Sequence, residues 1–478
     1  MATSPVQAKI EKRCYLHLNP SGRLFCSKCG ARRPWLTWPK LLILVPVVLL
    51  LASVVVFSMR SCYTPVSKED FLLHGSNTLG DELIPKLLHE FLISENVKDI
   101  KITAERKLDQ TVLQGVLPDS LQPVTFKVYA PGTAIGIQHL NKQTCDIAMA
   151  SRRMTDDELK SFANPSEIMG YMIALDGIAI IVHNSNPEST ISLDDVRMIF
   201  AGITKNWKNG QPINVYAPDD NSGTFKEFVG RVLQKDDTFV NTRNRYADIR
   251  EVVIKVSQDP NGIGFVGSAF LTKTVKPLAV SEAGSPLEPT TFNISTEDYP
   301  LTRRLYLYTS GNSRQPWSSK FINFVLSDIG REIIGKAGFV QTNITTVRFS
   351  RSDATEKYRN LTNNAERLSL DFRFDSGKSN LDDKALADLE RVIKFLRSAQ
   401  YANKKVLLLG FADNSGTDAA SDSVSWDRAD AVRQKLQQSI PQAIDRYKFG
   451  SQLPVANNAT SDGKKKNRRV EIWIAPAK

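Results

Sequence analysis

One acidic and one basic residue in the last quarter of the chain have the types and spacing to bind a small zwitterion. Asp413 lies in the segment LGFADNSGTD, and Arg428 follows fifteen residues later in VSWDRADAV. A carboxylate accepts hydrogen bonds from an ammonium group, and a planar guanidinium binds a carboxylate through two parallel hydrogen bonds. If folding brings these side chains together, they can hold both charged ends of an amino acid. The alternative is a surface ion pair that ties a strand to a helix and contributes little energy.

The hydrophobic pattern around these two residues predicts the elements that position them. Alternating apolar and polar residues predict strands, and apolar residues three or four apart predict helices. The elements predicted are, in order, a half-buried strand at 367–374, a helix at 386–396, a short buried strand at 406–411, a second helix around 429–436 and a last strand at 470–474. This β-α-β-α-β order predicts an α+β domain with a mixed sheet and helices on one face.

Residues 366–478 resemble the OmpA-like peptidoglycan-binding domain. The motifs that carry the resemblance are FDSGKSNL, GFAD, SWDRA and NRR, and they occur in the order that the family has. The resemblance implies that Asp413 and Arg428 bind the diaminopimelate of bacterial peptidoglycan. It also implies that Asn467 and Arg468 support this site.

This C-terminal stretch departs from the OmpA-like pattern at three positions. Phe411 and Ala412 stand where the family usually has His-Thr before the aspartate. Ser421 stands where the family has an asparagine eight residues after the aspartate. Each departure removes a side chain that could form a hydrogen bond, so we expect weaker binding than is usual for the family.

Three loops in the middle of the chain each lead from a strand-like run into a helical one. They begin at Gly75 (GSNTLGDELIPKLLHEFL), Ala130 (APGTAIGIQHL) and Asp219 (DDNSGTFKEFVGRVL). The N-terminus of a helix offers unpaired N–H groups and the positive end of a dipole. If three such ends converge with short hydroxyl side chains beside them, they form a cage for a tetrahedral oxyanion. One loop of this kind alone does not identify a site.

Together with the segments between them, these loops resemble the periplasmic phosphate-binding protein family, the substrate-binding component of phosphate ABC transporters. The motifs CDIAMASRRM, ALDGIAIIVHNSNP, IFAGITKNW and GIGFVG also follow in the order of the family. The resemblance implies an α/β two-lobed periplasmic-binding-protein fold over 60–347, with the anion in the cleft between the lobes. The implied anion ligands are Ser76, Asn77, Thr78, Gly132, Thr133, Ser151, Arg152, Ser222, Gly223 and Thr224.

The charge at this implied site departs from the family pattern. The family often has an arginine four residues before the serine of the SGT motif, and Pro218 stands at that position. Arg152 could supply the charge instead; otherwise phosphate would bind weakly or the anion would differ. Asp219 and Asp220 could accept a proton from phosphate and so reject sulfate, or they could only cap the following helix. A fold that is retained without any ligand is the other interpretation of this domain.

An uncharged apolar run of nineteen residues at 41–59 predicts a single transmembrane helix within 36–59, because it can span about 30 Å of hydrocarbon. The run is too long and begins too late for a signal peptide. The residues before Cys62 do not fit a lipoprotein site. Residues 1–40 carry eight Lys or Arg and one acid. The positive-inside rule therefore places them in the cytoplasm of a bacterium and the bulk of the chain in the periplasm, anchored in the inner membrane.

The cytoplasmic head, residues 1–35, contains two pairs of metal-binding side chains. Cys14 and His17 form a C-x-x-H pair, and Cys26 and Cys29 form a C-x-x-C pair. Four such ligands match a tetrahedral structural zinc site. Because this segment is too short to build a core, zinc could supply its folding energy. The head resembles a degenerate zinc ribbon; the alternative is a basic leader that holds no metal.

The composition bounds the classes of function. A chain of 478 residues suggests about three domains. Much of its net charge of +11 comes from the first forty residues, which argues against binding of nucleic acid by a folded domain. The polar segment 348–365 predicts a linker or a solvated helix. Cys62 and Cys145 would both lie in an oxidising compartment, where they could form a disulfide or remain thiols.

The sequence predicts a binding protein rather than an enzyme, because no nucleophile–base arrangement stands out. The predicted molecule spans the inner membrane once, binds phosphate or a similar oxyanion, and attaches to peptidoglycan; envelope or transporter proteins are further expected partners. One alternative is a structural tether whose middle domain is a spacer or docks a partner. Another is a phosphoester hydrolase, which the lack of an obvious acidic metal cluster disfavours.

Overall fold

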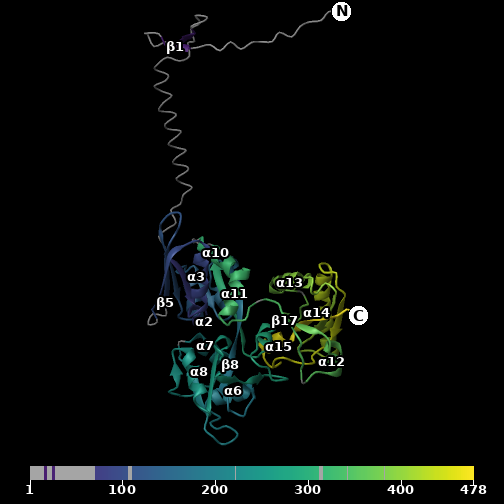
Figure 1. The fold of residues 1–478 in the computed structure, drawn as a ribbon. Coiled ribbons are helices and arrows are strands. Elements are labelled where there is room, and N and C mark those ends of the chain that lie inside the picture. Colours follow the sequence, from purple (N-terminus) through teal and green to yellow (C-terminus); the bar gives the residue numbers. More distant parts are fainter. Residues whose placement is uncertain are drawn as a thin grey trace, which may run out of the picture. The chain divides into compact units, whose positions relative to one another are not determined.

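The computed structural model describes residues 70–477, apart from 106–109, 221, 312–315, 342, 352, 380 and 382, and two short strands nearer the N-terminus (Figure 1). These fall in two units, 1–69 and 70–478. In the first unit, β1 (Leu16–Leu18) pairs antiparallel with β2 (Leu24–Cys26), so that His17 lies opposite Phe25.

Several predictions from the sequence fall outside the described residues. The apolar run 41–59 lies outside them, and so do Cys14, Cys29 and Cys62. Among the residues that are described, no helix combines the length and the apolar composition needed to cross a bilayer. The predicted transmembrane helix and zinc site therefore remain predictions.

The second unit begins with an eleven-stranded sheet in the order β11-β10-β12-β8-β15-β7-β3-β6-β5-β4, with β13 also paired to β8. Its strands are β3 (Phe71–Gly75), β4 (Lys98–Glu105), β5 (Gln110–Val116), β6 (Pro123–Tyr129), β7 (Ile147–Ala150), β8 (Ile168–His183), β10 (Asn214–Pro218), β11 (Arg245–Tyr246), β12 (Gly262–Gly267), β13 (Val275–Pro277) and β15 (Thr302–Ser310). A separate parallel pair joins β9 (Thr190–Ser192) to β14 (Ala279–Ser281).

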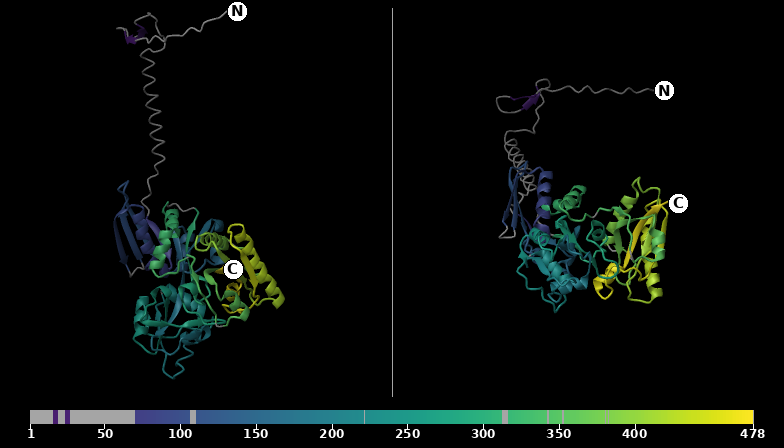
Figure 2. Two further views of the ribbon diagram at one scale, coloured as in Figure 1. Left: turned by 45° about the vertical axis from the view of Figure 1, so that its right-hand side comes forward. Right: turned by 60° about the horizontal axis from the view of Figure 1, so that its bottom comes forward.

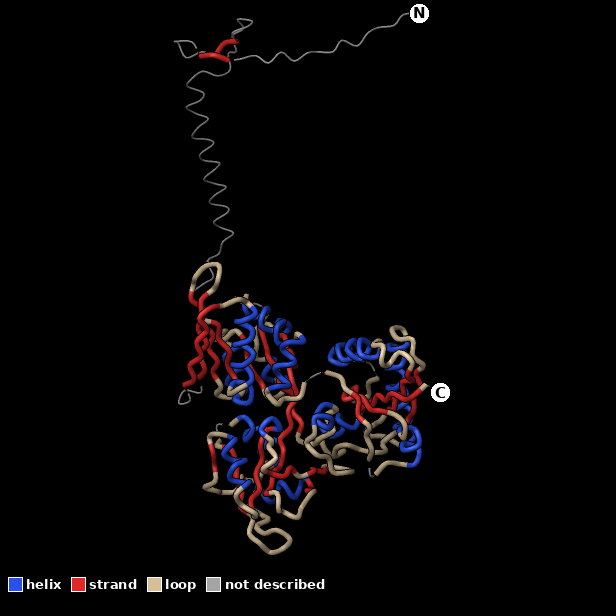
Figure 3. The backbone as a smooth tube through the Cα atoms, in the orientation of Figure 1, coloured by secondary structure: helices blue, strands red, loops and turns tan. Residues whose placement is uncertain are grey.

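Two hydrophobic cores divide this sheet into two lobes. One core packs β3 and β6 against α3, and the other packs β12 against α6 and α7. The long strand β8 contributes to both cores and pairs antiparallel with β15, so it connects the lobes (Figures 2 and 3). The predicted two-lobed α/β fold is therefore confirmed.

The longer helices cover the sheet because they bury an apolar face. In α3, for example, Phe91 packs edge-on against Phe126 and Phe321. The helices of the N-terminal lobe are α2 (Asn77–Gly80), α3 (Leu83–Ser94), α4 (Thr133–Asn141), α5 (Asp156–Lys160), α10 (Trp317–Leu326) and α11 (Asp328–Lys336). Those of the C-terminal lobe are α6 (Leu193–Phe200), α7 (Gly223–Val232), α8 (Ile249–Ser257) and α9 (Thr291–Ser295).

The C-terminal domain contains a five-stranded sheet in the order β16-β17-β20-β18-β19. The strands are β16 (Thr346–Val347), β17 (Glu366–Arg373), β18 (Lys404–Gly410), β19 (Ile444–Lys448) and β20 (Arg469–Pro476). The helices are α12 (Glu356–Thr362), α13 (Asp383–Leu396), α14 (Asp418–Gln437) and α15 (Ser461–Asn467). The predicted three strands and two helices are confirmed, and the sheet is mixed, because β18 pairs parallel with β19 and antiparallel with β20.

Two predictions for this domain were wrong, and one was right only in part. Helices do not cover one face alone: α13 and α14 pack on one face, and α12 packs on the other beside Trp473. The segment 348–365 is no linker: it contains the helix α12, which was the other prediction for it. Glu356 and Lys357 are exposed, but Tyr358 is buried against the sheet, so this helix is not solvated on all sides. The strand β17 is buried on both faces rather than on one. Its polar residues were expected in water, but they form a buried charge network.

Candidate functional site

The N-termini of α2 and α7 belong to different lobes and meet across the cleft. A Cβ atom placed on Gly223 would lie 3.3 Å from Thr78 Oγ1 and 3.6 Å from Asn77 Oδ1. Ser222 caps α7, where its hydroxyl accepts a hydrogen bond from the Phe225 amide. A glycine at position 223 therefore allows the two predicted anion loops to approach closely, and the described conformation has the lobes in contact.

Three polar side-chain atoms on the first loop are buried without a partner. Ser76 Oγ, Asn77 Oδ1 and Thr78 Oγ1 form no hydrogen bond within the part of the chain that the structure describes. A buried polar atom without a partner costs about 1–3 kcal/mol. Such groups are uncommon in folded proteins, so three neighbouring ones indicate a place prepared for a polar ligand.

The second predicted loop adjoins the first. The Gly132 amide donates to the Gly75 carbonyl at 2.8 Å, and Gly132 has φ +122°, a backbone conformation that side chains disfavour. At the start of α4, Thr133 Oγ1 lies 3.2 Å from Ser151 Oγ and accepts the Ser151 amide at 3.1 Å. From the other lobe, Lys226 Nζ comes within 3.6 Å of a Cβ placed on Gly132. The predicted residues that these contacts place therefore gather around one cleft.

Arg152 forms a bidentate ion pair with Glu158 rather than standing without a counter-charge. The two guanidinium–carboxylate distances are both 2.8 Å. Hydrogen bonding to Glu158 raises the pKa of Arg152 and, despite the opposing effect of burial, the same contact lowers the pKa of Glu158. The charge of Arg152 is thus paired with an acid of its own lobe.

The sequence analysis missed a buried arginine beside the third loop. Arg303 on β15 is 1% exposed and binds Asp176 Oδ2 through Nε at 2.9 Å and Nη2 at 2.6 Å. The same Nη2 donates to Thr224 Oγ1 at 3.1 Å. Its Nη1 is buried and has no hydrogen-bond partner among the described residues. Two adjacent arginines at the start of the strand TRRLYLY were the only sequence signal for it.

The two acids before α7 have partners of their own. Asp219 Oδ1 accepts the Ser222 amide at 3.1 Å, which stabilises the turn that leads into α7. Asp220 Oδ1 pairs with Arg245 Nη2 at 2.8 Å, and Asp220 is mostly exposed. Neither acid caps α7 directly, because the cap residue is Ser222.

In the C-terminal domain, Asp413 and Arg428 come close together, but the direct partner of Asp413 is Arg468. Arg468 Nη1 lies 2.7 Å from Asp413 Oδ2. Arg428 donates to the carbonyls of Phe411 at 3.3 Å and Lys378 at 3.2 Å. Asp413 and Arg428 are both buried, which excludes the solvated surface pair that was the alternative.

Electrostatics in this second site reflect two cations beside one anion. Burial and the neighbouring Arg468 lower the pKa of Arg428 to about 10, so Arg428 remains charged at neutral pH. Burial alone would raise the pKa of Asp413, but hydrogen bonds from Arg468 and Ser415 bring it below its usual value. The three side chains together carry one net positive charge, which suits a ligand with at least one carboxylate.

Asn467 positions this second site rather than contributing to it directly. Its Oδ1 accepts the amides of Val455 at 2.8 Å and Ala456 at 3.1 Å, and its Nδ2 donates to Ala456 and Asn458. These contacts fix the loop that precedes α15. Arg468 follows directly in the chain.

The three positions that depart from the OmpA-like pattern are also accounted for. The Phe411 ring stacks with Phe449, and the Ala412 amide donates to Gly450. Ser421 Oγ reaches the Asp413 carbonyl at 3.5 Å. Phe411 and Ala412 therefore make contacts inside the domain, whereas Ser421 contacts the backbone of Asp413, a predicted ligand-binding residue.

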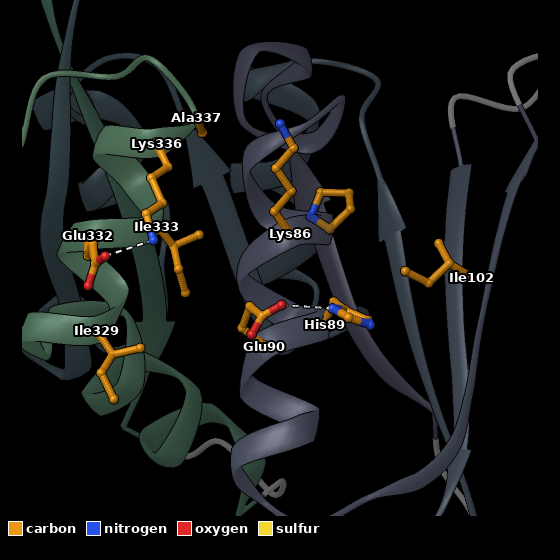
Figure 4. Close-up of a pocket in the computed structure, with 10 residues that line it drawn as sticks. Lys86, His89, Glu90, Ile102, Ile329, Glu332, Ile333, Lys336 and Ala337 are labelled. Atoms are coloured by element: carbon orange, nitrogen blue, oxygen red, sulfur yellow. Dashed lines mark hydrogen bonds and ion pairs between the residues drawn. The ribbon is translucent and has the colours of Figure 1, made fainter.

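The described residues hold no further site that matches a prediction. Among them, no group of three His, Cys, Asp or Glu side chains is arranged to hold a metal ion. Cys145 is a buried free thiol. A hollow of about 610 Å³ lies between α3 and α11, lined by residues that include His89, Glu90 and Ile329 (Figure 4). None of the residues predicted to bind a ligand lines it.

Comparison with known proteins agrees with this two-part organisation. The family model of the PBP superfamily domain matches residues 94–328, and that of the OmpA family matches residues 373–468. The phosphate-binding protein PstS of Staphylococcus saprophyticus is 30% identical over 233 residues, which cover 45% of this chain and 71% of that protein. The phosphate-binding protein PstS of Pseudomonas aeruginosa is 29% identical over 244 residues, which cover 45% of this chain and 74% of that protein.

Among solved structures, an ABC-type phosphate transport receptor from Vibrio cholerae aligns with a TM-score of 0.45 at 22% identity. The alignment covers 57% of this chain and all of that one.

Proposed function

Because the chain belongs to the PBP superfamily of PstS-like proteins and carries a C-terminal domain of the OmpA family, we propose that it binds phosphate at the bacterial cell wall. The two-lobed domain holds phosphate, or a similar tetrahedral oxyanion, in its cleft. The C-terminal domain attaches to peptidoglycan.

The observation that carries the anion site is the set of unpartnered buried atoms on Ser76, Asn77 and Thr78, which face the N-terminus of α7. An oxyanion between the lobes accepts hydrogen bonds from the two hydroxyls and from the amides at the start of α7. The Asn77 amide can turn its NH₂ group toward the same anion. Binding thereby supplies the partners that these groups lack, and it joins the two lobes.

Members of the family often have an arginine at the position of Pro218, which supplies positive charge to the site. In this chain, Arg303 supplies that charge. Asp176 holds the guanidinium, and Asp176 is itself fixed by hydrogen bonds from Gly177 and Ser268. The guanidinium reaches the site through Thr224 and keeps Nη1 as an unused donor. A fixed guanidinium suits the oxygens of a phosphate because its donors lie in one plane.

The C-terminal site binds the free amino-acid end of diaminopimelate. Asp413 accepts hydrogen bonds from the ammonium group, and Arg428 binds the carboxylate. Arg468 holds Asp413 in place, and Asn467 fixes the loop that leads to Arg468.

We further propose that residues 36–59 span the inner membrane once, with the N-terminus in the cytoplasm and the remainder in the periplasm. In the head, Cys14, His17, Cys26 and Cys29 hold one structural zinc ion. Metal analysis of the purified chain tests the head: about one zinc per chain is expected, and Cys26→Ser should abolish it. A chain without zinc would favour the basic leader.

Titration calorimetry of the full chain with inorganic phosphate tests the anion site. We expect saturable binding that Thr224→Ala weakens at least about tenfold, since one charge-assisted hydrogen bond contributes roughly 1.5–3 kcal/mol. Thr272→Ala, an exposed control, should leave binding unchanged. The absence of heat with phosphate, sulfate and other oxyanions would favour a structural tether with a spacer domain.

A further inference from the structure

The buried polar face of β17 is covered by a loop of the C-terminal lobe. Asp298, between α9 and β15, is fully buried. Its Oδ2 lies 2.8 Å from Arg367 Nη2, and its Oδ1 lies 3.0 Å from Arg373 Nη2. One aspartate of the anion-binding domain is thus held by two arginines of the C-terminal domain.

The two arginines belong to a larger network whose charges balance. Arg367 also binds Asp371 at 2.6 Å and lies 3.5 Å from Glu471, which pairs with Arg469 at 2.8 Å. Two neutral side chains adjoin these charges: Tyr358 and Trp473 both donate a hydrogen bond to Glu471. Three acids and three arginines therefore share one buried cluster. Within this cluster, the two ion pairs of Asp298 are the contacts that join the domains, and substitution of Asp298 would leave buried arginine charge without its partner.

A second set of contacts adjoins the two proposed ligand sites. Lys466 Nζ donates to the Pro300 carbonyl at 2.8 Å and to the Tyr299 carbonyl at 3.3 Å. Lys466 comes two residues before Arg468, which binds Asp413. Pro300 comes three residues before Arg303 of the anion site. Short, buried stretches of backbone therefore connect the two sites through this interface.

Aromatic rings and a close backbone approach complete the interface. The rings of Phe292 and Phe349 lie 5.3 Å apart, and the Arg367 guanidinium lies over both. A Cβ placed on Gly284 would lie only 2.8 Å from the Pro454 carbonyl. Glycine is required there because the two domains touch through their backbones.

We propose that the C-terminal domain is a fixed extension of the C-terminal lobe, so that closure of the anion cleft moves the wall-binding site relative to the N-terminal lobe. The chain enters that N-terminal lobe at β3, soon after the apolar run 41–59. Anion binding and the position of the wall-binding domain are then linked, and the linkage acts in both directions. This inference rests on the proposed anion binding.

Distance measurements between spin labels on the full chain test this proposal. Labels on ketone-bearing residues, which spare the native cysteines, replace three exposed lysines: Lys101 in the N-terminal lobe, Lys208 in the C-terminal lobe and Lys435 in the C-terminal domain. On addition of inorganic phosphate, we expect the Lys101–Lys435 distance to change. The Lys208–Lys435 distance should stay narrow and constant. If the second distance changes as much as the first, the proposal is overturned.

Calorimetry on the same labelled chains separates the possible failures. Absence of phosphate heat would contradict the proposed function itself, whereas heat without a change in the Lys101–Lys435 distance would contradict only the linkage. Lys466→Met removes the contacts to Tyr299 and Pro300 without leaving a buried carboxylate unpaired. It should broaden the Lys208–Lys435 distribution. An unchanged distribution in both this variant and Asp298→Ala would overturn the assignment of the interface.

Discussion

At the scale of single residues, the geometry of Arg303 explains how a cleft without the usual arginine can bind an anion. Its guanidinium binds Asp176 through two nitrogens and Thr224 through one, and it retains one unpaired nitrogen. An ammonium group carries the same charge but lacks the planar fork. The shape of the side chain, and not its charge alone, should therefore matter.

Arg303→Lys should weaken phosphate binding about tenfold or more, because the lysine cannot contact Asp176, Thr224 and the anion together. Arg304→Lys is the matched control, since the next residue of a strand points to the opposite face and Arg304 pairs with Glu297. Titration calorimetry measures both. Equal affinity for the two variants would contradict this role of Arg303.

The wall-binding site gives a second prediction at this scale. Asp413→Asn keeps the shape of the side chain but removes the negative charge that would attract an ammonium group, and Arg428→Ala removes the donor for the carboxylate. Both should reduce sedimentation of the chain with purified peptidoglycan at least tenfold. Asp422→Asn, a half-exposed position on the same helix, serves as the control. Unchanged sedimentation of both site variants would end this assignment.

At the scale of elements, the approach of α2 to α7 depends on a residue without a side chain. Gly223→Ala places a methyl group 3.3 Å from Thr78 Oγ1. We therefore expect the cleft to close less completely and the affinity for phosphate to fall several-fold. On the same helix, Gly230→Ala meets nothing within 4 Å and should raise stability by about 0.5–1 kcal/mol without affecting affinity. Thermal unfolding and calorimetry of the pair check this; loss of affinity in Gly230→Ala would argue for a general effect on α7.

The strand β17 illustrates what the sequence could and could not predict. Its alternating pattern predicted a strand with one polar face in water, and the strand is present. Its polar face is buried because Asp298 packs against it. Asp298 lies far away in the chain, and a local pattern carries no information about such a distant partner. Arg303 was missed for the same reason, since Asp176 is 127 residues away. The loops were predicted correctly because each joins a strand to a helix locally.

Burial of Asp298 predicts a dependence of stability on pH. Burial alone would raise its pKa, but the facing groups Arg367, Arg373 and Arg469 lower it below the ordinary value of an aspartate. The stabilisation by Asp298 is therefore complete above the unfolded-state pKa of about 4 and is lost as the pH falls toward the folded-state value. The difference in thermal midpoint between the chain and its Asp298→Asn variant should be large at pH 7 and shrink below pH 4. A difference independent of pH would contradict this.

At the scale of the whole molecule, the family motifs predicted both domains but not their contact. The segment 348–365 was expected to separate them, yet it carries α12 and packs against the C-terminal sheet. Asp298 joins the two domains through its ion pairs with Arg367 and Arg373 of the C-terminal domain.

The central claim is that the cleft between the lobes holds one oxyanion. Equilibrium dialysis of the full chain against radiolabelled phosphate measures this directly. We predict saturable binding that approaches one phosphate per chain, with a clearly lower occupancy in Arg303→Lys at the same sub-saturating phosphate concentration. No saturable uptake at millimolar phosphate, or equal uptake by the chain and the variant, would contradict the account.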